Sequence, residues 1–311
     1  MTPDFLQILA ARRLIVVTGK GGVGKSAITA SLGRLLARSG RRTLVLEVDP
    51  RENLHQLLDV APSGGEISAV EPNLWLQNLK PIQVVDWVVR RQVKVELLVQ
   101  RVLKSPVYHR FVEGAPGLRE MAILGHALRL VRGDTPSAPP IDTVILDAPA
   151  TGHGIYLLTA AQLYADTIGH GPFAQLAGEI ADFAADPDST SLVMVTLAED
   201  MPVQEALEMQ HTLKQDLGRS PDLLVVNGIY PDLPEDAAAL QEAGEFGDLW
   251  RRRREINEKE LVRLEESWQG PAVQLPLLPV DRSAALIERL VEGLEEAVPL
   301  TTVSHGENGH G

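Results

Sequence analysis

The chain has 311 residues, of which 44% are hydrophobic and 23% charged, and its formal net charge is −13. This composition can bury a sizeable core and is not that of a disordered protein, and the negative surface makes nucleic acid a poor partner. The chain contains no cysteine, which excludes disulfides, thiolate metal sites and thiol capture of soft metals, so any metal is expected to have oxygen ligands.

The first residues lack the basic start, long apolar run and small-residue cleavage site of a secretory signal. No stretch approaches the roughly 20 uninterrupted apolar residues that cross a bilayer. We therefore expect a cytoplasmic protein whose contact with a membrane, if it has one, is peripheral.

Apolar, β-branched runs alternate with segments of helical periodicity along most of the chain. The runs are near-continuous, which is typical of buried parallel strands. They lie at residues 14–18, 43–48, 74–79, 143–146, 192–197, 223–226 and 273–277. The helical segments lie at residues 25–38, 84–103, 117–131, 203–217 and 282–297. This order predicts an α/β fold with a doubly wound, mostly parallel sheet.

The length fits one α/β core with insertions, so residues 1–300 are predicted to form one domain. Two connections, residues 81–140 and 154–190, are longer than a crossover needs and rich in helix-forming apolar residues. We expect them to form an inserted helical subdomain. Residues 301–311 offer little apolar surface and are expected to be a disordered tail.

A phosphate-binding loop follows the first predicted strand, where residues 19–26 read GKGGVGKS and match the pattern G-x-x-x-x-G-K-[ST]. Glycines let successive N–H groups face a phosphate, and the start of the next helix favours negative charge. A glycine-rich turn that binds nothing is the alternative, but all fixed positions are in register with a strand and a helix. We expect ATP and Mg²⁺ as cofactors, bound by Gly19, Lys20, Gly21, Gly22, Val23, Gly24, Lys25, Ser26 and Ala27.

Within this loop, Lys25 is expected to reach the β- and γ-phosphates and Ser26 to offer its hydroxyl to Mg²⁺. Two aspartates follow predicted strands at the edge of the sheet where ligands bind. Asp49 comes after the second strand, and Asp147 closes the fourth, as a carboxylate that holds Mg²⁺ does. The predicted metal ligands are Ser26, Asp147 and Asp49.

Lys20 is additional to the general P-loop pattern. A loop with this extra lysine resembles that of the deviant P-loop family. This family includes the MinD and ParA ATPases, nitrogenase iron protein, and the arsenite-pump and tail-anchored-protein-targeting ATPases. Residues 49–54 (DPRENL) and 147–153 (DAPATGH) resemble the two switch segments of the ArsA-type branch. Residues 115–121 (APGLREM) and 275–279 (LPLLP) resemble its later motifs. The resemblance covers most of residues 14–290 and implies an ATP-hydrolysing dimer.

The resemblance also implies roles for single residues. The catalytic residues would be Asp49, which orients the attacking water, Lys25, and Lys20 reaching across the dimer to the partner's nucleotide. Asn227 would read the adenine, with Pro276 near the base, although an asparagine also commonly ends a strand. The switch residues would be Asn53, Thr151, Gly152 and His153.

The chain also departs from that branch. It has neither the cysteines that capture metalloids nor a C-x-x-C zinc site, so no zinc is expected. It has five methionines, and its second insertion is short for a groove that holds transmembrane segments. The four arginines at residues 251–254 are left without a role.

The expected function is a dimeric molecular switch, either a homodimer or a dimer with a paralogue, that couples Mg²⁺-ATP to its helical subdomain and acts on an unknown protein cargo or membrane partner. The alternative is a positional or scaffold regulator like MinD and ParA, with little turnover. A metabolic kinase is disfavoured because it would not use Lys20 in a partner's active site.

Overall fold

The computed structural model describes residues 4–48, 52–92, 95–135, 138–149, 153–168, 170–232, 244–281 and 283–297. In this part of the chain eight strands form one sheet in the order β3-β4-β2-β5-β1-β6-β7-β8. Only β3 runs antiparallel to its neighbour among these strands. The strands are β1 (Leu14–Thr18), β2 (Thr43–Glu47), β3 (Ser68–Glu71), β4 (Leu74–Asn78), β5 (Thr143–Asp147), β6 (Thr190–Leu197), β7 (Leu223–Ile229) and β8 (Ala272–Pro276). The predicted α/β class is confirmed.

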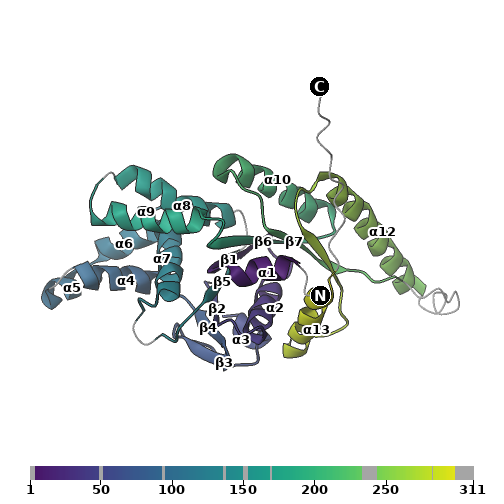
Figure 1. The fold of residues 1–311 in the computed structure, drawn as a ribbon, viewed down its shortest axis with the longest axis horizontal. Coiled ribbons are helices and arrows are strands. Elements are labelled where there is room, and N and C mark those ends of the chain that lie inside the picture. Colours follow the sequence, from purple (N-terminus) through teal and green to yellow (C-terminus); the bar gives the residue numbers. More distant parts are fainter. Residues whose placement is uncertain are drawn as a thin grey trace, which may run out of the picture.

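Helices cover both faces of this sheet, because successive residues of its buried strands point to opposite sides. Ile15 and Val17 pack with one set of helices, whereas Leu14 and Val16 pack with the other. The first set is α1 (Asp4–Ala11), α2 (Lys25–Arg38), α3 (Leu54–Leu57) and α13 (Ala284–Glu296). The second includes α7 (Leu118–Arg132), α8 (His153–Ile168), α9 (Pro172–Ala185), α10 (Asp200–Leu217) and α12 (Gly244–Ser267). Figure 1 shows this layered arrangement.

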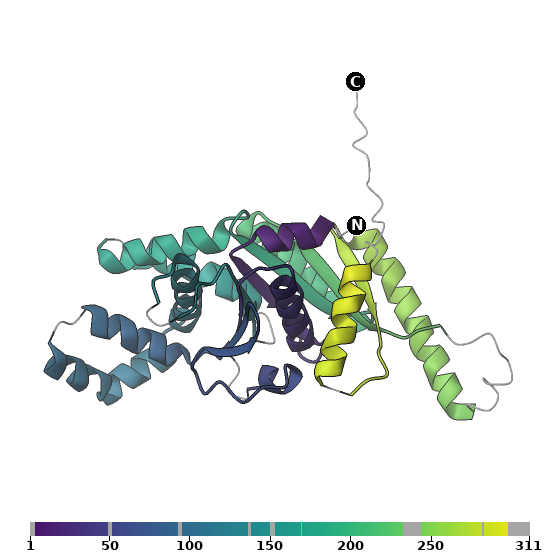
Figure 2. The same cartoon turned by 60° about the horizontal axis from the view of Figure 1, so that its bottom comes forward.

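Three further helices, α4 (Pro81–Gln92), α5 (Glu96–Leu103) and α6 (Pro106–Gly114), lie at one end of the molecule, and α12 lies at the other (Figure 1 and Figure 2). They precede α7 within the first predicted insertion, whereas α8 and α9 occupy the second. The single helix predicted at residues 84–103 is instead two helices, and α4 starts earlier because proline is tolerated in the first turn of a helix. The short edge strand β3 and the helices α1 and α3 had not been predicted, whereas α6 lies within the first predicted helical insertion.

The outer helices carry large apolar side chains on their surface. These exposed residues of α5 and α6 are Leu97, Leu98, Val102, Val107 and Phe111. Among the helices that the structure describes, none is both long enough and apolar enough to cross a membrane.

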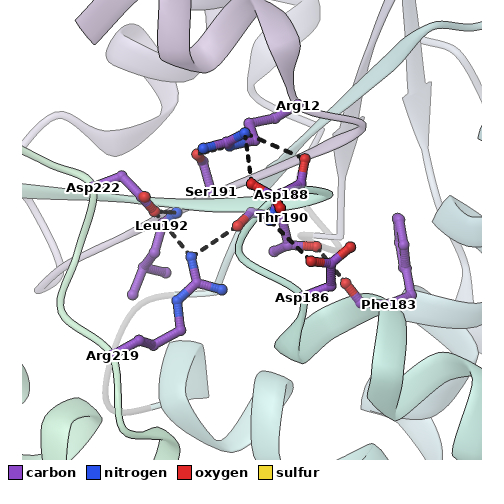
Figure 3. A network of polar contacts seen from close by, with 9 residues as sticks. All are labelled: Arg12, Phe183, Asp186, Asp188, Thr190, Ser191, Leu192, Arg219 and Asp222. Carbon is purple, nitrogen blue, oxygen red and sulfur yellow. Dashed lines mark hydrogen bonds and ion pairs between the residues drawn. The ribbon is translucent and has the colours of Figure 1, made fainter.

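A polar network fixes the start of β6 (Figure 3). The start of β6 lies beside the start of β1, whereas the phosphate-binding loop follows the end of β1. The Arg219 guanidinium donates to the Asp222 carboxylate at 3.0 Å, and this carboxylate accepts the backbone N–H of Leu192 at 2.8 Å. Arg12, which precedes β1, donates to the Ser191 hydroxyl at 3.3 Å. The network thus ties two adjacent strands together without entering the loop region.

Candidate nucleotide-binding site

The phosphate-binding loop connects β1 to α2, and two of its glycines are required by close contacts. Gly19 and Gly24 have φ angles of 145° and 94°, which side chains rarely allow. A Cβ at Gly19 would lie 2.1 Å from the carbonyl oxygen of Val195, and one at Gly24 would lie 2.3 Å from Nδ2 of Asn227. The loop conformation therefore depends on both glycines and on the strands β6 and β7 behind them.

Lys25, the first residue of α2, is a buried cation with 8% of its surface exposed. Its Nζ donates to the carbonyl oxygen of Lys20 at 2.8 Å. Burial lowers the pKa of the Lys25 ammonium, and the nearby Asp147 carboxylate raises it. A desolvated cation at the start of a helix is suited to an anionic ligand, because water does not compete for its charge.

Ser26 and Asp147 meet beside this cation. The Ser26 hydroxyl donates to Asp147 Oδ2 at 2.7 Å, and the Thr29 hydroxyl donates to Oδ1 at 3.3 Å. A hydroxyl next to a carboxylate fits Mg²⁺, which takes few protein ligands and completes its shell with phosphate oxygens and water. No group of three or more acidic, histidine or cysteine side chains that could hold a metal ion occurs within the described residues.

Asn227 lies on β7, and Pro276 lies on the adjacent strand β8. The Asn227 amide donates from Nδ2 to the carbonyl oxygen of Val23 at 3.0 Å, so Asn227 supports the loop from behind. Pro276 ends β8, where its partner on β7 is Ile229. Both therefore belong to the same edge of the sheet as the loop, where the sequence predicted the base.

Lys20, which the resemblance assigns to a partner's nucleotide, contacts its own chain. Its Nζ lies 2.5 Å from Oε1 of Glu205, a residue of α10. The two side chains are partly exposed, at 32% and 38%. The sequence analysis assigned no role to Glu205, because nothing in the neighbouring sequence indicates which residue an acidic side chain on a surface helix will contact.

The switch segments are described in part. Asp49, Thr151 and Gly152 lie outside the described residues, and only the backbone of His153 is described, as the first residue of α8. Asn53 precedes α3, and its N–H donates to Oε1 of Glu47 at 2.8 Å. The predicted roles of Asp49, Asn53, Thr151, Gly152 and His153 stay predictions.

Glu47 anchors the first switch segment from the end of β2, where 1% of its surface is exposed. Its carboxylate also accepts the N–H of Leu54 at 3.3 Å and the amide of Asn78 at 3.2 Å. Burial raises the pKa of Glu47 to about 7, and the carboxylate of Asp147, its partner in the strand register, contributes to the rise. Sequence reasoning missed this residue, although a charge that closes an apolar strand was a usable signal.

The arginines of α12 form ion pairs with acidic side chains of the same chain. Arg253 pairs with Glu199 at 3.1 Å, and Arg254 with Asp232 at 2.9 Å. Arg251 pairs with Asp248 at 3.2 Å. Of the four arginines at residues 251–254, these three thus contribute to a salt-bridged helix surface.

A comparison with known families identifies the chain. A sequence model of the anion-transporting ATPases matches residues 12–171 and 172–292. The chain belongs to this family. The resemblance based on the loop and the switch motifs is therefore confirmed, as is the assignment to a class of ATPases.

Several known proteins are similar to this chain over much of its length. The ATPase BagA of Mycobacterium tuberculosis is 32% identical over 227 residues, which are 67% of this chain and 62% of that protein. The arsenical pump-driving ATPase of Acidiphilium multivorum is 26% identical over 302 residues, which are 91% of this chain and 49% of that protein. A putative arsenical pump-driving ATPase of Aquifex aeolicus is 24% identical, with 95% and 79% coverage. The chain thus spans about half to four-fifths of these relatives.

Proposed function

We propose that this protein hydrolyses Mg²⁺-ATP. The observation that carries the proposal is the buried Lys25 ammonium at the start of α2, 8% exposed, beside the hydrogen-bonded pair of Ser26 and Asp147. A fixed cation stabilises the charge of a transferring phosphoryl group, and Ser26 and Asp147 would hold Mg²⁺, which would neutralise further charge. Asp49 would orient the attacking water.

The protein would act as a dimer, of two identical chains or with a paralogue, in which each Lys20 completes the partner's site. Lys20 supports this role because it belongs to the phosphate-binding loop and is 32% exposed, whereas Lys25 is buried in its own site. A charged side chain at the rim of a site can serve a neighbouring subunit at little cost in desolvation.

ATP would be coupled to a cargo, protein or membrane partner through the outer helices. Arg119 of α7 contacts the carbonyl oxygen of Val48, next to the first switch segment, at 3.5 Å. A cavity of about 580 Å³ lies beside Arg119 and Tyr156, between the first insertion and α8. Movement of either switch would therefore change the shape of this cavity and of the exposed apolar surface on α5 and α6.

The alternative is a positional or scaffold regulator of the MinD and ParA type, in which ATP occupancy acts as a signal with little turnover. Steady-state phosphate release separates the two functions. Turnover that depends on protein concentration supports the dimeric ATPase, whereas ATP binding with negligible phosphate release supports the regulator.

A mixing experiment tests the transfer of Lys20 between subunits. A Lys20→Ala chain keeps a complete site of its own but cannot supply the partner, and a Lys25→Ala chain cannot bind ATP but still offers Lys20. Each variant alone is expected to have at least about tenfold lower turnover than wild type, since a charge-assisted hydrogen bond contributes about 1.5–3 kcal/mol. The mixture is expected to regain turnover in the sites of the Lys20→Ala chain.

The matched control mixes the Lys25→Ala chain with a chain carrying both substitutions, which leaves no complete site in any pairing. Rescue in the first mixture and not in the second supports the proposal. A protein that stays strictly monomeric with ATP in light scattering, together with no rescue, would contradict it.

A further inference from the structure

Lys20 is held by an acidic side chain of its own subunit. Its Nζ lies 2.5 Å from Oε1 of Glu205, in the second turn of α10. The lysine comes from a loop and the glutamate from a helix 185 positions later in the chain. The pair therefore exists only because the fold brings α10 over the phosphate-binding loop.

This pair differs from the other ion pairs of α10 and its N-cap. Glu199 and Asp200 pair with Arg253 and Arg263, both on α12, at 3.1 and 3.3 Å. Those contacts join two helices on the same face of the sheet. Glu205 instead pairs with the one residue that distinguishes this loop from the general P-loop pattern.

We propose that Glu205 is a positioning residue that keeps Lys20 on its own subunit until ATP-dependent dimerisation draws Lys20 to the partner's phosphates. The inference rests on the proposed dimeric function. An ammonium that donates to a carboxylate at 2.5 Å must give up that contact before it can reach across an interface. Glu205 is thus not a catalytic residue, because it acts through Lys20.

The exposure of the pair makes this contact reversible. Both side chains are about one-third exposed, and ion pairs of this kind are weak because water and salt screen them. Release is expected to cost about two- to fivefold in equilibrium constant for each pair. A symmetric dimer releases two pairs, so the total effect on dimerisation is about 4- to 25-fold.

The position of α10 also connects this contact with the second switch segment. α10 packs against α8, whose first residue is His153 of that segment. A displacement of α8 on ATP binding would move α10 relative to the loop. Nucleotide binding would thereby loosen the contact of Glu205 in the same subunit that presents Lys20.

The experiment measures the dimer dissociation constant of the full chain by analytical ultracentrifugation with Mg²⁺ and the β,γ-imido analogue of ATP. Glu205→Gln keeps the size of the side chain and removes its charge, and is expected to tighten the dimer about 4- to 25-fold. The matched control is Glu199→Gln, which removes an equal charge at the N-cap of the same helix, and is expected to leave the constant unchanged.

The same measurement in a Lys20→Ala background separates this inference from the proposed function. Loss of the Glu205→Gln effect in that background supports the inference, because the effect then acts through Lys20. If Lys20→Ala weakens the dimer while Glu205→Gln leaves it unchanged or weakens it, the inference is overturned and the dimeric function stands. If Lys20→Ala does not affect the dimer, or no dimer forms, both are overturned.

Discussion

At the scale of single residues, the site depends on contacts that leave no room for substitution. Gly24 lies against the Asn227 amide, and that amide holds the carbonyl oxygen of Val23. The asparagine that the resemblance assigns to adenine therefore also supports the loop. These two roles of Asn227 can be separated, because reading the adenine affects binding of the base, whereas support of the loop affects binding of the phosphates.

Gly24→Ala is expected to weaken ATP binding at least about 100-fold, because the new methyl would meet Asn227 Nδ2 and because a φ of 94° is strained for alanine. Calorimetric titration measures the loss. The double variant Gly24→Ala, Asn227→Ala removes the atom that the methyl meets and is expected to bind ATP more tightly than Gly24→Ala alone. Additive losses would show that the contact with Asn227 does not determine the loop conformation.

At the scale of elements, a buried hydrogen-bonded chain joins the first insertion to the sheet. His126 of α7 is 7% exposed, and its Nε2 lies 2.9 Å from Oε1 of Gln77 on β4. Nε2 of Gln77 donates to the carbonyl oxygen of Gly65 at 2.9 Å. Helix α7 is therefore held to the sheet by a hydrogen bond that the Nε2–H of the neutral imidazole donates to Gln77, and burial opposes a charge on His126.

Protonation of His126 is expected to lower the free energy of unfolding as the pH decreases from about 6.5 to about 4. Burial lowers the pKa of this imidazole to about 4, with a further contribution from Arg129, whereas in the unfolded chain it titrates near 6.5. The unfolded state thus binds more protons within this window, so the free energy of unfolding rises with pH. On acidification through the window this contribution is lost, and its upper limit is about 3.4 kcal/mol.

Urea unfolding of wild type and His126→Gln at several pH values measures this contribution. The difference between the two proteins is expected to shrink as pH falls, since the remaining groups titrate in both. A difference that stays constant from pH 7.5 to 4.5 would show that His126 is not held neutral by the fold.

At the scale of the whole molecule, the site is assembled from strands that are far apart in the chain. Asp147 reaches Ser26 from 121 positions away, and Asn227 reaches Val23 from 204 positions away. Binding of a nucleotide therefore requires the central sheet to be formed. A ligand that binds only the folded state raises the free energy of unfolding of the whole fold by mass action.

The β,γ-imido analogue of ATP with Mg²⁺, at a concentration 100 times its dissociation constant, is expected to stabilise the protein by about 2.7 kcal/mol. Chemical unfolding with and without the ligand measures the gain. Lys25→Ala is expected to abolish it, because this substitution removes the cation that the loop buries. An equal gain in that variant would place the nucleotide elsewhere.

The sequence alone predicted every strand of the described sheet except β3, the glycine-rich loop between β1 and α2, the position of Asp147 at the end of a strand, and the family. These features are local: continuous apolar runs, glycines at fixed spacing, and an acid at the end of a strand. The break between α4 and α5 and the edge strand β3 had weaker local patterns and were missed.

The tertiary structure alone decided which side chains meet. Glu47 becomes the anchor of Asn53 because β2 ends beneath the first switch segment, and Glu205 becomes the partner of Lys20 because α10 lies over the loop. An acidic residue in a sequence is equally consistent with a solvated surface. Its pKa and its partner depend on burial and on distant residues, such as Lys20, which is 185 positions from Glu205, and only the packed fold brings them into contact.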